Sequence, residues 1–198
     1  MIKWKGYLKG MLWITLILVG LTLDSAIVML NKGAQLSSLS LKNTVCYSLI
    51  FAVVSLVVYS LGFGFFELIG QYVFSKKMQV FISVAIVLCT GINIITKSAL
   101  KKPFLERVDR DFDLKNLVRI ALATNIDSFF VGGAISLYGT PFIMTGVGLF
   151  IMTFVIILIS LRAGYSLGAG YQKLIGVMGG SLIVVFSFYL GLLVFILR

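Results

Sequence analysis

Two aspartates, Asp24 and Asp127, each interrupt a long apolar stretch that otherwise contains no charged residue. An ionised carboxylate near the centre of a membrane helix costs roughly 2.5–3.5 kcal/mol on insertion scales, so two such positions need an explanation. A serine follows each acid, Ser25 in the first stretch and Ser128 in the second. Carboxylate and hydroxyl oxygens suit hard cations such as Mg²⁺ or Mn²⁺. The pattern therefore predicts a cation site in which both aspartates are metal ligands.

Further polar side chains lie close to the two acids in the sequence. Asn31 falls two helical turns after Asp24 on the same face, and Thr124 falls one turn before Asp127. Two more amides, on Asn93 and Asn125, lie within apolar runs. The predicted supporting set is Ser25, Asn31, Asn93, Thr124, Asn125 and Ser128.

A structural role for the two acids is the alternative. Each aspartate would then be protonated, or would pair with a neighbouring polar group and only hold helices together. One acid inside the membrane leaves this choice open, whereas a repeated pair favours a transported ion or proton.

The elements that must carry these residues are membrane-spanning helices. The chain of 198 residues is 60% hydrophobic and only 12% charged, against about 25% charged in soluble domains. Apolar runs of about 18 or more residues can span a bilayer as helices, and six are predicted: Gly10–Leu30, Thr44–Phe66, Met78–Thr96, Ile120–Tyr138, Pro141–Leu161 and Leu174–Leu197. The first is expected to be retained, because it exceeds signal-peptide length and contains Asp24. The predicted fold class is an all-α polytopic membrane protein, one membrane domain over residues 1–198.

The positions of the two acids also suggest an internal repeat. Each half of the chain opens with a span that carries one central Asp-Ser pair, and glycine recurs in the third span of each half, at Gly91 and Gly191. Two sets of three crossings must have opposite orientations, which is the inverted repeat of many secondary transporters. The prediction is a first repeat over residues 1–100, a polar loop over 101–119 and a second repeat over 120–198. A turn signal over residues 138–141 predicts that the fourth and fifth spans are antiparallel neighbours.

The net charge of +10 is explained better by a membrane than by nucleic acid, because the basic residues lie at the ends of the apolar runs. More of them fall in the connections on the side of the polar loop than on the side of the termini, which predicts a cytoplasmic loop and external termini. Lys3, Lys5 and Lys9 argue the other way. Membrane lipid, and no nucleic acid, is the expected partner.

Several function classes are disfavoured by missing residues. The chain has no histidine, and Cys46 and Cys89 stand in separate apolar runs, where they are expected to be small core residues. Nucleotide-binding loops and nucleophile elbows are also missing from the sequence. We expect neither an enzyme nor a resident cofactor.

At the two acids the sequence resembles the small bacterial manganese efflux pumps, the MntP-like family. The residues Asp24-Ser25-Ala26-Ile27 stand where that family has an Asp-Ala-Phe-Ala type motif, and Lys32-Gly33-Ala34 comes next at the family's spacing. The segment 123–128 is similar to the family's Ala-Thr-Ser-x-Asp-Ala motif, and Val131-Gly132 matches the residues after that motif. The family usually carries two further acids and an arginine. This chain departs from it there, since Val54 and Thr96 stand at the places of the acids and Ile92 at that of the arginine.

The resemblance implies a secondary transporter in the bacterial inner membrane that exports a divalent cation, with Mn²⁺ as the first choice. The cation is then a substrate, and it would be moved by alternating access. Proton exchange on the same carboxylates and homodimerisation stay open. Two alternatives also remain: a membrane scaffold or assembly protein, and an exporter of another small cation or an amino acid.

Overall fold

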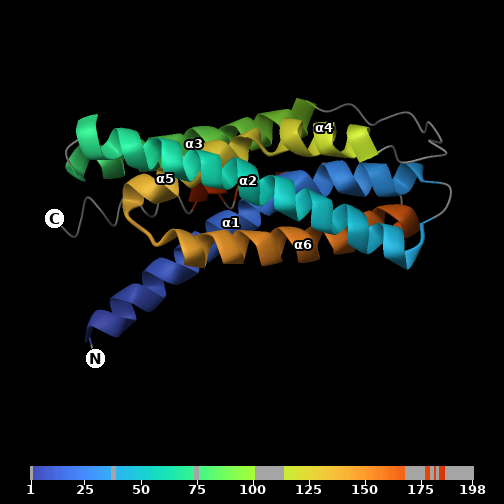
Figure 1. The fold of residues 1–198 in the computed structure, drawn as a ribbon, viewed down its shortest axis with the longest axis horizontal. Coiled ribbons are helices and arrows are strands. Elements are labelled where there is room, and N and C mark those ends of the chain that lie inside the picture. Colours follow the sequence, from blue (N-terminus) through green and yellow to red (C-terminus); the bar gives the residue numbers. More distant parts are fainter. Residues whose placement is uncertain are drawn as a thin grey trace.

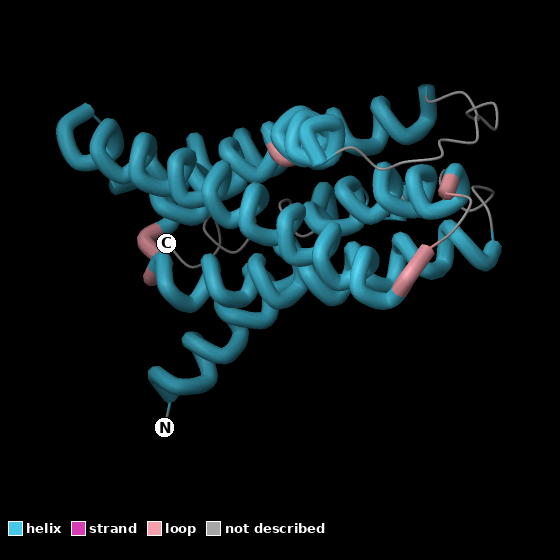
Figure 2. The backbone as a smooth tube through the Cα atoms, turned by 45° about the vertical axis from the view of Figure 1, so that its right-hand side comes forward, coloured by secondary structure: helices cyan, strands magenta, loops and turns pink. Residues whose placement is uncertain are grey.

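The computed structural model describes residues 2–36, 39–73, 76–100, 114–167, 177–178, 181 and 183–185. Helices account for nearly all of them: α1 (Ile2–Gln35), α2 (Leu41–Val73), α3 (Lys76–Leu100), α4 (Leu114–Thr124), α5 (Ile126–Tyr138) and α6 (Phe142–Leu167). The helices lie side by side along the length of the molecule (Figure 1, Figure 2). The predicted all-helical fold class is confirmed for this part of the chain.

Among the described residues, three helices are long and apolar enough to cross a membrane: α1 over Ile14–Gln35, α2 over Leu41–Gly70 and α6 over Phe142–Ser166. The helices α4 and α5 together could form a fourth span, which bends by 44° at a break. α3 holds a shorter apolar stretch, Phe81–Thr96. The first five predicted spans therefore fall on described helices, whereas most of the sixth, Leu174–Leu197, lies outside the described residues.

The helices α1 and α6 pack against each other and run in the same direction. Leu18 lies against Gly148 near one end of the pair, and the backbone of Leu30 lies against Gly164 near the other. A Cβ atom at Gly164 would collide with the Leu30 carbonyl, so only glycine allows this close approach. The pair joins a helix from the first half of the chain to one from the second half.

The helices α2 and α5 form a second parallel pair of the same kind. The backbone of Phe129 lies against Gly62, and Leu137 lies against Gly70, two turns further along both helices. α2 and α6 run in opposite directions, and the Tyr59 hydroxyl on α2 donates a hydrogen bond of 2.8 Å to Oγ1 of Thr145 on α6. α2 therefore lies between α5 and α6 and contacts both.

The predicted packing of the fourth span against the fifth is wrong. The chain does reverse at the predicted turn, where Gly139 adopts a left-handed φ of 84°. After the turn, however, α5 packs mainly on α2 and α3, whereas α6 packs mainly on α1 and α2. The turn therefore determines only that the chain reverses its direction. The glycine contacts described above determine which helices α5 and α6 pack against.

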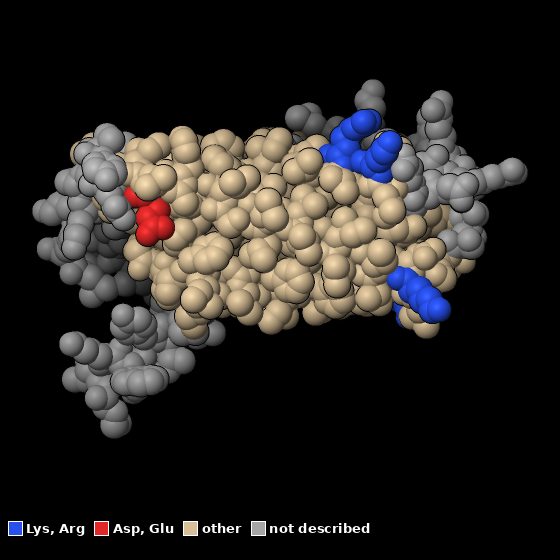
Figure 3. Space-filling view, in the orientation of Figure 1, with Lys and Arg blue, Asp and Glu red and all other residues tan. Residues whose placement is uncertain are grey.

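The basic side chains that the structure describes gather at one end of the bundle, which we call the basic end (Figure 3). They are Lys32, Lys42, Lys115, Arg119 and Arg162. Glu67 lies near the C-terminal end of α2, at the opposite end of that helix from Lys42. Large apolar side chains such as Leu61, Phe81 and Ile143 are exposed on the outer faces of the helices between the two ends, as contact with lipid requires.

Two apolar clusters fill the interior at different depths. The basic-end cluster contains Met29, Phe51, Leu117, Ala121, Ile157 and Leu161. The opposite-end cluster contains, among others, Ile17, Leu21, Tyr59, Phe63, Val131 and Leu149. Cys46 and Cys89 belong to neither: the prediction that they are core residues is wrong, since both are exposed on outward faces of their helices.

Candidate cation site

Buried polar side chains occupy the depth between the two apolar clusters. On α1, Asp24 and Ser25 stand between Leu21 of the opposite-end cluster and Met29 of the basic-end cluster. The same order holds on α2, on α6 and across the junction of α4 with α5. We call this set the polar layer; its members, each 4% exposed or less, are Asp24, Ser25, Ser55, Asn125, Asp127, Ser128 and Thr153.

Asp24 lies on an unbroken helix that is buried on almost all sides at this depth. Its exposed fraction is 4%, and its neighbours Ala26 and Ile27 are each 1% exposed. A charge in such surroundings is stable only with polar partners or a bound cation. The predicted burial of this acid within the first span is confirmed.

Asp127 lies beside a break in the fourth span. α4 ends at Thr124 and α5 begins at Ile126, so Asp127 stands in the first turn of α5. The positive end of the helix dipole favours a negative charge at this position. The break therefore places Asp127 at the N-terminal end of a helix in the interior of the bundle.

The polar residues at the break satisfy the backbone of α4. The Asn125 side-chain amide donates to the Ala121 carbonyl at 2.8 Å, and the Thr124 hydroxyl donates to the Ile120 carbonyl at 2.8 Å. Ser128 donates to Oδ1 of Asn125 at 3.2 Å. Thr124 and Asn125, both predicted as supporting groups, thus engage their own helix through these hydrogen bonds.

The acid on α5 is joined to α3 by an amide. Nδ2 of Asn93 donates a hydrogen bond of 3.3 Å to Oδ1 of Asp127. The two residues also line one end of a hollow of about 550 Å³ between α3 and α5, together with Thr90. Two of the predicted site residues, far apart in the sequence, are therefore in contact.

Asp24 does not line this hollow. The structure places the two acids at the same depth, between the same two clusters, without joining them in one described cavity. Within the described ranges, no group of three or more acids, cysteines or histidines gathers at one point. A cation held in the polar layer would therefore need neutral oxygen ligands beside the carboxylates.

Asn31 lies on the basic-end side of the polar layer rather than within it. Its exposed fraction is 9%, and its Oδ1 atom has no hydrogen-bond partner in the part of the chain that the structure describes. Asn31 therefore provides a polar side chain between the polar layer and the basic end.

Two hydroxyls of the polar layer, on Ser55 and Thr153, were not predicted. Thr153 is fully buried, and its Oγ1 atom has no partner among the described residues. Hydroxyl residues in membrane helices usually bond to a carbonyl of their own helix, as Thr22 and Thr145 do. Single hydroxyls in apolar runs give too weak a sequence signal to single these two out.

A family model described as "Putative manganese efflux pump" (Mntp) matches residues 38–190. The chain belongs to the Mntp family. This confirms the predicted family, which is one of transporters rather than enzymes. The match includes Asp127 and the whole second half of the polar layer but begins after Asp24.

Individual Mntp proteins match over most of their length. The chain is 24% identical over 185 residues to a protein of Methanosphaera stadtmanae named "Putative manganese efflux pump MntP", covering 90% of this chain and 97% of that one. Proteins of the same name match from Elusimicrobium minutum, at 26% identity over 85% of this chain and 90% of the relative, and from Acetivibrio thermocellus, at 27% over 85% and 84%. Significant similarity to a solved structure was not found.

Proposed function

We propose that the protein exports a divalent cation, with Mn²⁺ as the first choice, across the bacterial cell membrane. The observation that carries this proposal is the polar layer, in which Asp24 and Asp127 are buried at one depth between two apolar clusters. Secondary transporters hold their substrate near the midplane of the membrane in this way. The Mntp relatives, named as manganese efflux pumps, support the choice of ion.

The donor set of the layer suits a hard divalent cation. Two carboxylates balance the charge of one such ion, and hydroxyl and amide oxygens complete an oxygen shell. Asp24 and Asp127 are the proposed charged ligands. The supporting oxygens are those of Ser25, Ser128 and Asn125 within the layer, with Asn93 and Thr124 beside it. Because this chain lacks the family's usual further acids, the site has fewer charged ligands and would bind the ion less tightly. Weaker binding suits a transport site, which must release its ion.

Alternating access would open one apolar cluster at a time. The basic-end cluster and the opposite-end cluster lie on the two sides of the polar layer, so each separates the site from one face of the membrane. In an inverted repeat α1 corresponds to the fourth span and α2 to α6. The parallel pairs α1–α6 and α2–α5 would then be equivalent, which supports the six-helix, two-repeat architecture.

Protons are the proposed coupling ion, and the basic end the proposed cytoplasmic end. A carboxylate binds a metal only when it is deprotonated, so metal and protons compete for Asp24 and Asp127. An excess of Lys and Arg marks the cytoplasmic side of membrane proteins, and the five described basic side chains share one end. Export would then carry the ion from the basic end to the end with Glu67.

A structural scaffold is the second candidate, favoured by the hydrogen bond between Asn93 and Asp127. An acid that only joins helices would make such a contact across α3 and α5. A neutral amide in place of Asp127 could keep that contact but could not balance a cation. The two candidates therefore differ in what an Asp→Asn change does.

Cation flux in sealed vesicles tests the proposal. Uptake and efflux would be measured for Mn²⁺, Cd²⁺, Mg²⁺ and small amino acids, with and without a pH gradient. We expect Mn²⁺ flux that a proton gradient drives and that Asp127→Asn abolishes, while Glu67→Gln, a change at an exposed acid, retains it. Transport of an amino acid instead of Mn²⁺ would contradict the proposal. So would the absence of Mn²⁺ flux in protein that has both aspartates.

A further inference from the structure

The outward face of α3 carries an amide at the depth of the polar layer. The side chain of Asn93 is exposed, although its Nδ2 atom donates to the buried Asp127. The amide also has a second N–H group and a carbonyl oxygen, and in the part of the chain that the structure describes neither has a hydrogen-bond partner. Hydrocarbon offers no partner to such groups. The exposed amide therefore favours contact with another protein surface at this depth.

Small side chains accompany this amide on the same face of α3. Ala85 and Cys89 precede Asn93 by two helical turns and by one, and both are exposed. Small residues four positions apart let two membrane helices approach closely, and polar side chains such as asparagine then form hydrogen bonds across the contact. The exposed face of α2, by contrast, carries large apolar side chains such as Val57 and Leu61. The outward face of α3 therefore has the residue types of a helix–helix contact.

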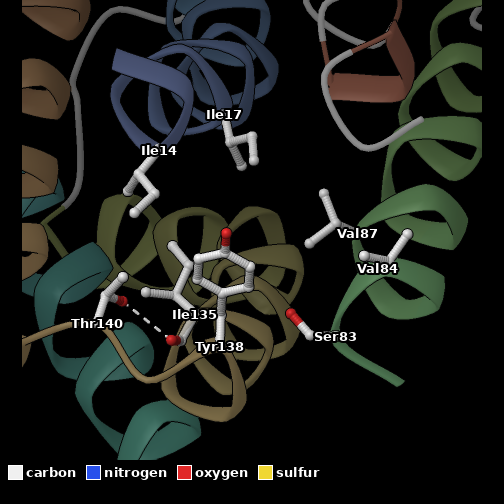
Figure 4. A pocket seen from close by; sticks show the side chains of 8 residues that line it. All are labelled: Ile14, Ile17, Ser83, Val84, Val87, Ile135, Tyr138 and Thr140. Atoms are coloured by element: carbon white, nitrogen blue, oxygen red, sulfur yellow. Dashed lines mark hydrogen bonds between the residues drawn. The ribbon is translucent and has the colours of Figure 1, made fainter. Parts of the chain in front are cut away.

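The inward face of α3 is already packed within the chain. Figure 4 shows Val87 of α3 facing Ile17 of α1 across a cavity of about 20 Å³, a volume that holds about one water. One turn after Val87, Gly91 lies against Ile183, which belongs to the predicted sixth span. The described part of that span therefore contacts a different face of α3 from the one that carries Asn93.

We propose that the outward face of α3, defined by Ala85, Cys89 and Asn93, is the contact between two copies of this chain. A second copy is the partner that the chemistry favours, because an amide both donates and accepts, so two copies of Asn93 can bond to each other reciprocally. A lipid chain would fill the groove between α3 and α5 but leave the amide unsatisfied. The second copy would cover this groove and shield Asp127, which lines it, from lipid. The contact does not depend on which ion the protein carries.

Symmetry determines which residues meet. Two copies inserted in the same direction are related by a twofold axis along the membrane normal, and such a contact uses the same patch on both copies. The two α3 helices then run parallel, and each residue of the patch faces its own counterpart. Helix axes roughly 8–10 Å apart, with Cα atoms at a radius of about 2.3 Å, bring facing Cα atoms to roughly 3.5–5.5 Å. A disulfide joins Cα atoms about 4.4–6.8 Å apart, so two copies of Cys89 should be able to form one.

Oxidative cross-linking of the full-length protein in lipid vesicles tests the contact. The Cys46→Ser variant keeps Cys89 as its only thiol, and the Cys89→Ser variant keeps the exposed Cys46 as the matched control. Copper–phenanthroline catalyses the oxidation, in which oxygen accepts the two electrons and two protons that a pair of thiols loses. We expect a covalent dimer through Cys89 that persists when the vesicles are diluted with lipid, and none through Cys46. A Cys89 dimer that is absent, or that falls with dilution as random collision requires, would overturn the inference.

Substitutions on the same face provide a second test, measured as the dimer dissociation constant from energy transfer between labelled copies at graded protein-to-lipid ratios. Ala85→Leu should weaken the dimer at least about fivefold through overpacking. Gly64→Leu, on α2 where a Cβ atom meets nothing within 4 Å, is the control and should leave the constant unchanged. Asn93→Leu should weaken the dimer about tenfold, since each of two reciprocal hydrogen bonds between membrane helices contributes about a factor of three. Unchanged constants in both Ala85→Leu and Asn93→Leu would assign this face to lipid and overturn the inference.

Discussion

The side-chain amide of Asn93 on α3 donates a hydrogen bond of 3.3 Å to the carboxylate of Asp127 on α5. This contact orients the acid toward the hollow and ties the third span to the broken fourth span. Hydrogen bonds to charged groups contribute about 1.5–3 kcal/mol each, so the amide contributes to the position of the charge that would bind the cation.

Asn93→Ala should raise the Mn²⁺ concentration that half-saturates transport by about tenfold, which corresponds to about 1.4 kcal/mol. The reason is that Asp127 loses the donor that holds it in place. Transport rates at graded Mn²⁺ concentrations measure the effect. Asn116→Ala, which removes an exposed amide on α4, is the matched control and should leave the curve unchanged. An unchanged curve for Asn93→Ala as well would remove this residue from the site.

Alanine substitutions at two glycines of α2 are expected to have different effects on stability. A Cβ atom at Gly62 would meet the backbone of Phe129, whereas a Cβ atom at Gly64 would meet nothing within 4 Å. Gly62→Ala should therefore destabilise the protein by about 1–3 kcal/mol through overpacking. Gly64→Ala should be neutral, or stabilise by up to about 1 kcal/mol through helix propensity. Thermal unfolding in detergent compares the two, and equal melting temperatures would contradict the α2–α5 packing.

Two buried threonines on α6 form a second matched pair. Thr153 has no hydrogen-bond partner among the described residues, whereas Thr145 accepts a bond from Tyr59. Replacing a buried unpaired hydroxyl by an isosteric methyl should be neutral or stabilise by about 1 kcal/mol, and replacing a paired one should destabilise by a similar amount. The prediction is that Thr153→Val raises the melting temperature of the metal-free protein and that Thr145→Val lowers it. A large loss of stability in Thr153→Val would mean that its hydroxyl does have a protein partner.

Local features of the fold were predictable from the sequence, and packing was not. The burial of Asp24 and Asp127 followed from their place within apolar runs, and the reversal at Gly139 followed from turn chemistry. The break at Asn125 was missed because it depends on side chains that bond to their own backbone instead of continuing the helix. The partners of α5 and α6 were missed because glycine contacts between helices choose them.

The two acids of the candidate site were predicted from the sequence, but the residues around them were predicted only in part. Asn93 was predicted to be buried within an apolar run, and this is wrong because its side chain is exposed; only the packing of α3 on α5 brings it to Asp127. Thr153 gave no signal, because its place in the polar layer depends on which face of α6 is turned inward. The exposure of Cys89 depends on the hollow beside it, which no pattern along the chain encodes.

Binding of Mn²⁺ to the purified protein is the sharpest test of a cation site built on Asp24 and Asp127, because it depends on neither coupling nor membrane orientation. Titration calorimetry or the electron paramagnetic resonance signal of free Mn²⁺ would compare wild-type protein with Asp24→Asn, Asp127→Asn and the control Glu67→Gln. We predict one site per chain in wild type and in Glu67→Gln, and affinity at least about a hundredfold weaker, or about 2.8 kcal/mol, in each Asp→Asn variant. Unchanged Mn²⁺ affinity in both Asp→Asn variants, with the helical circular dichroism spectrum intact, would contradict the proposed site.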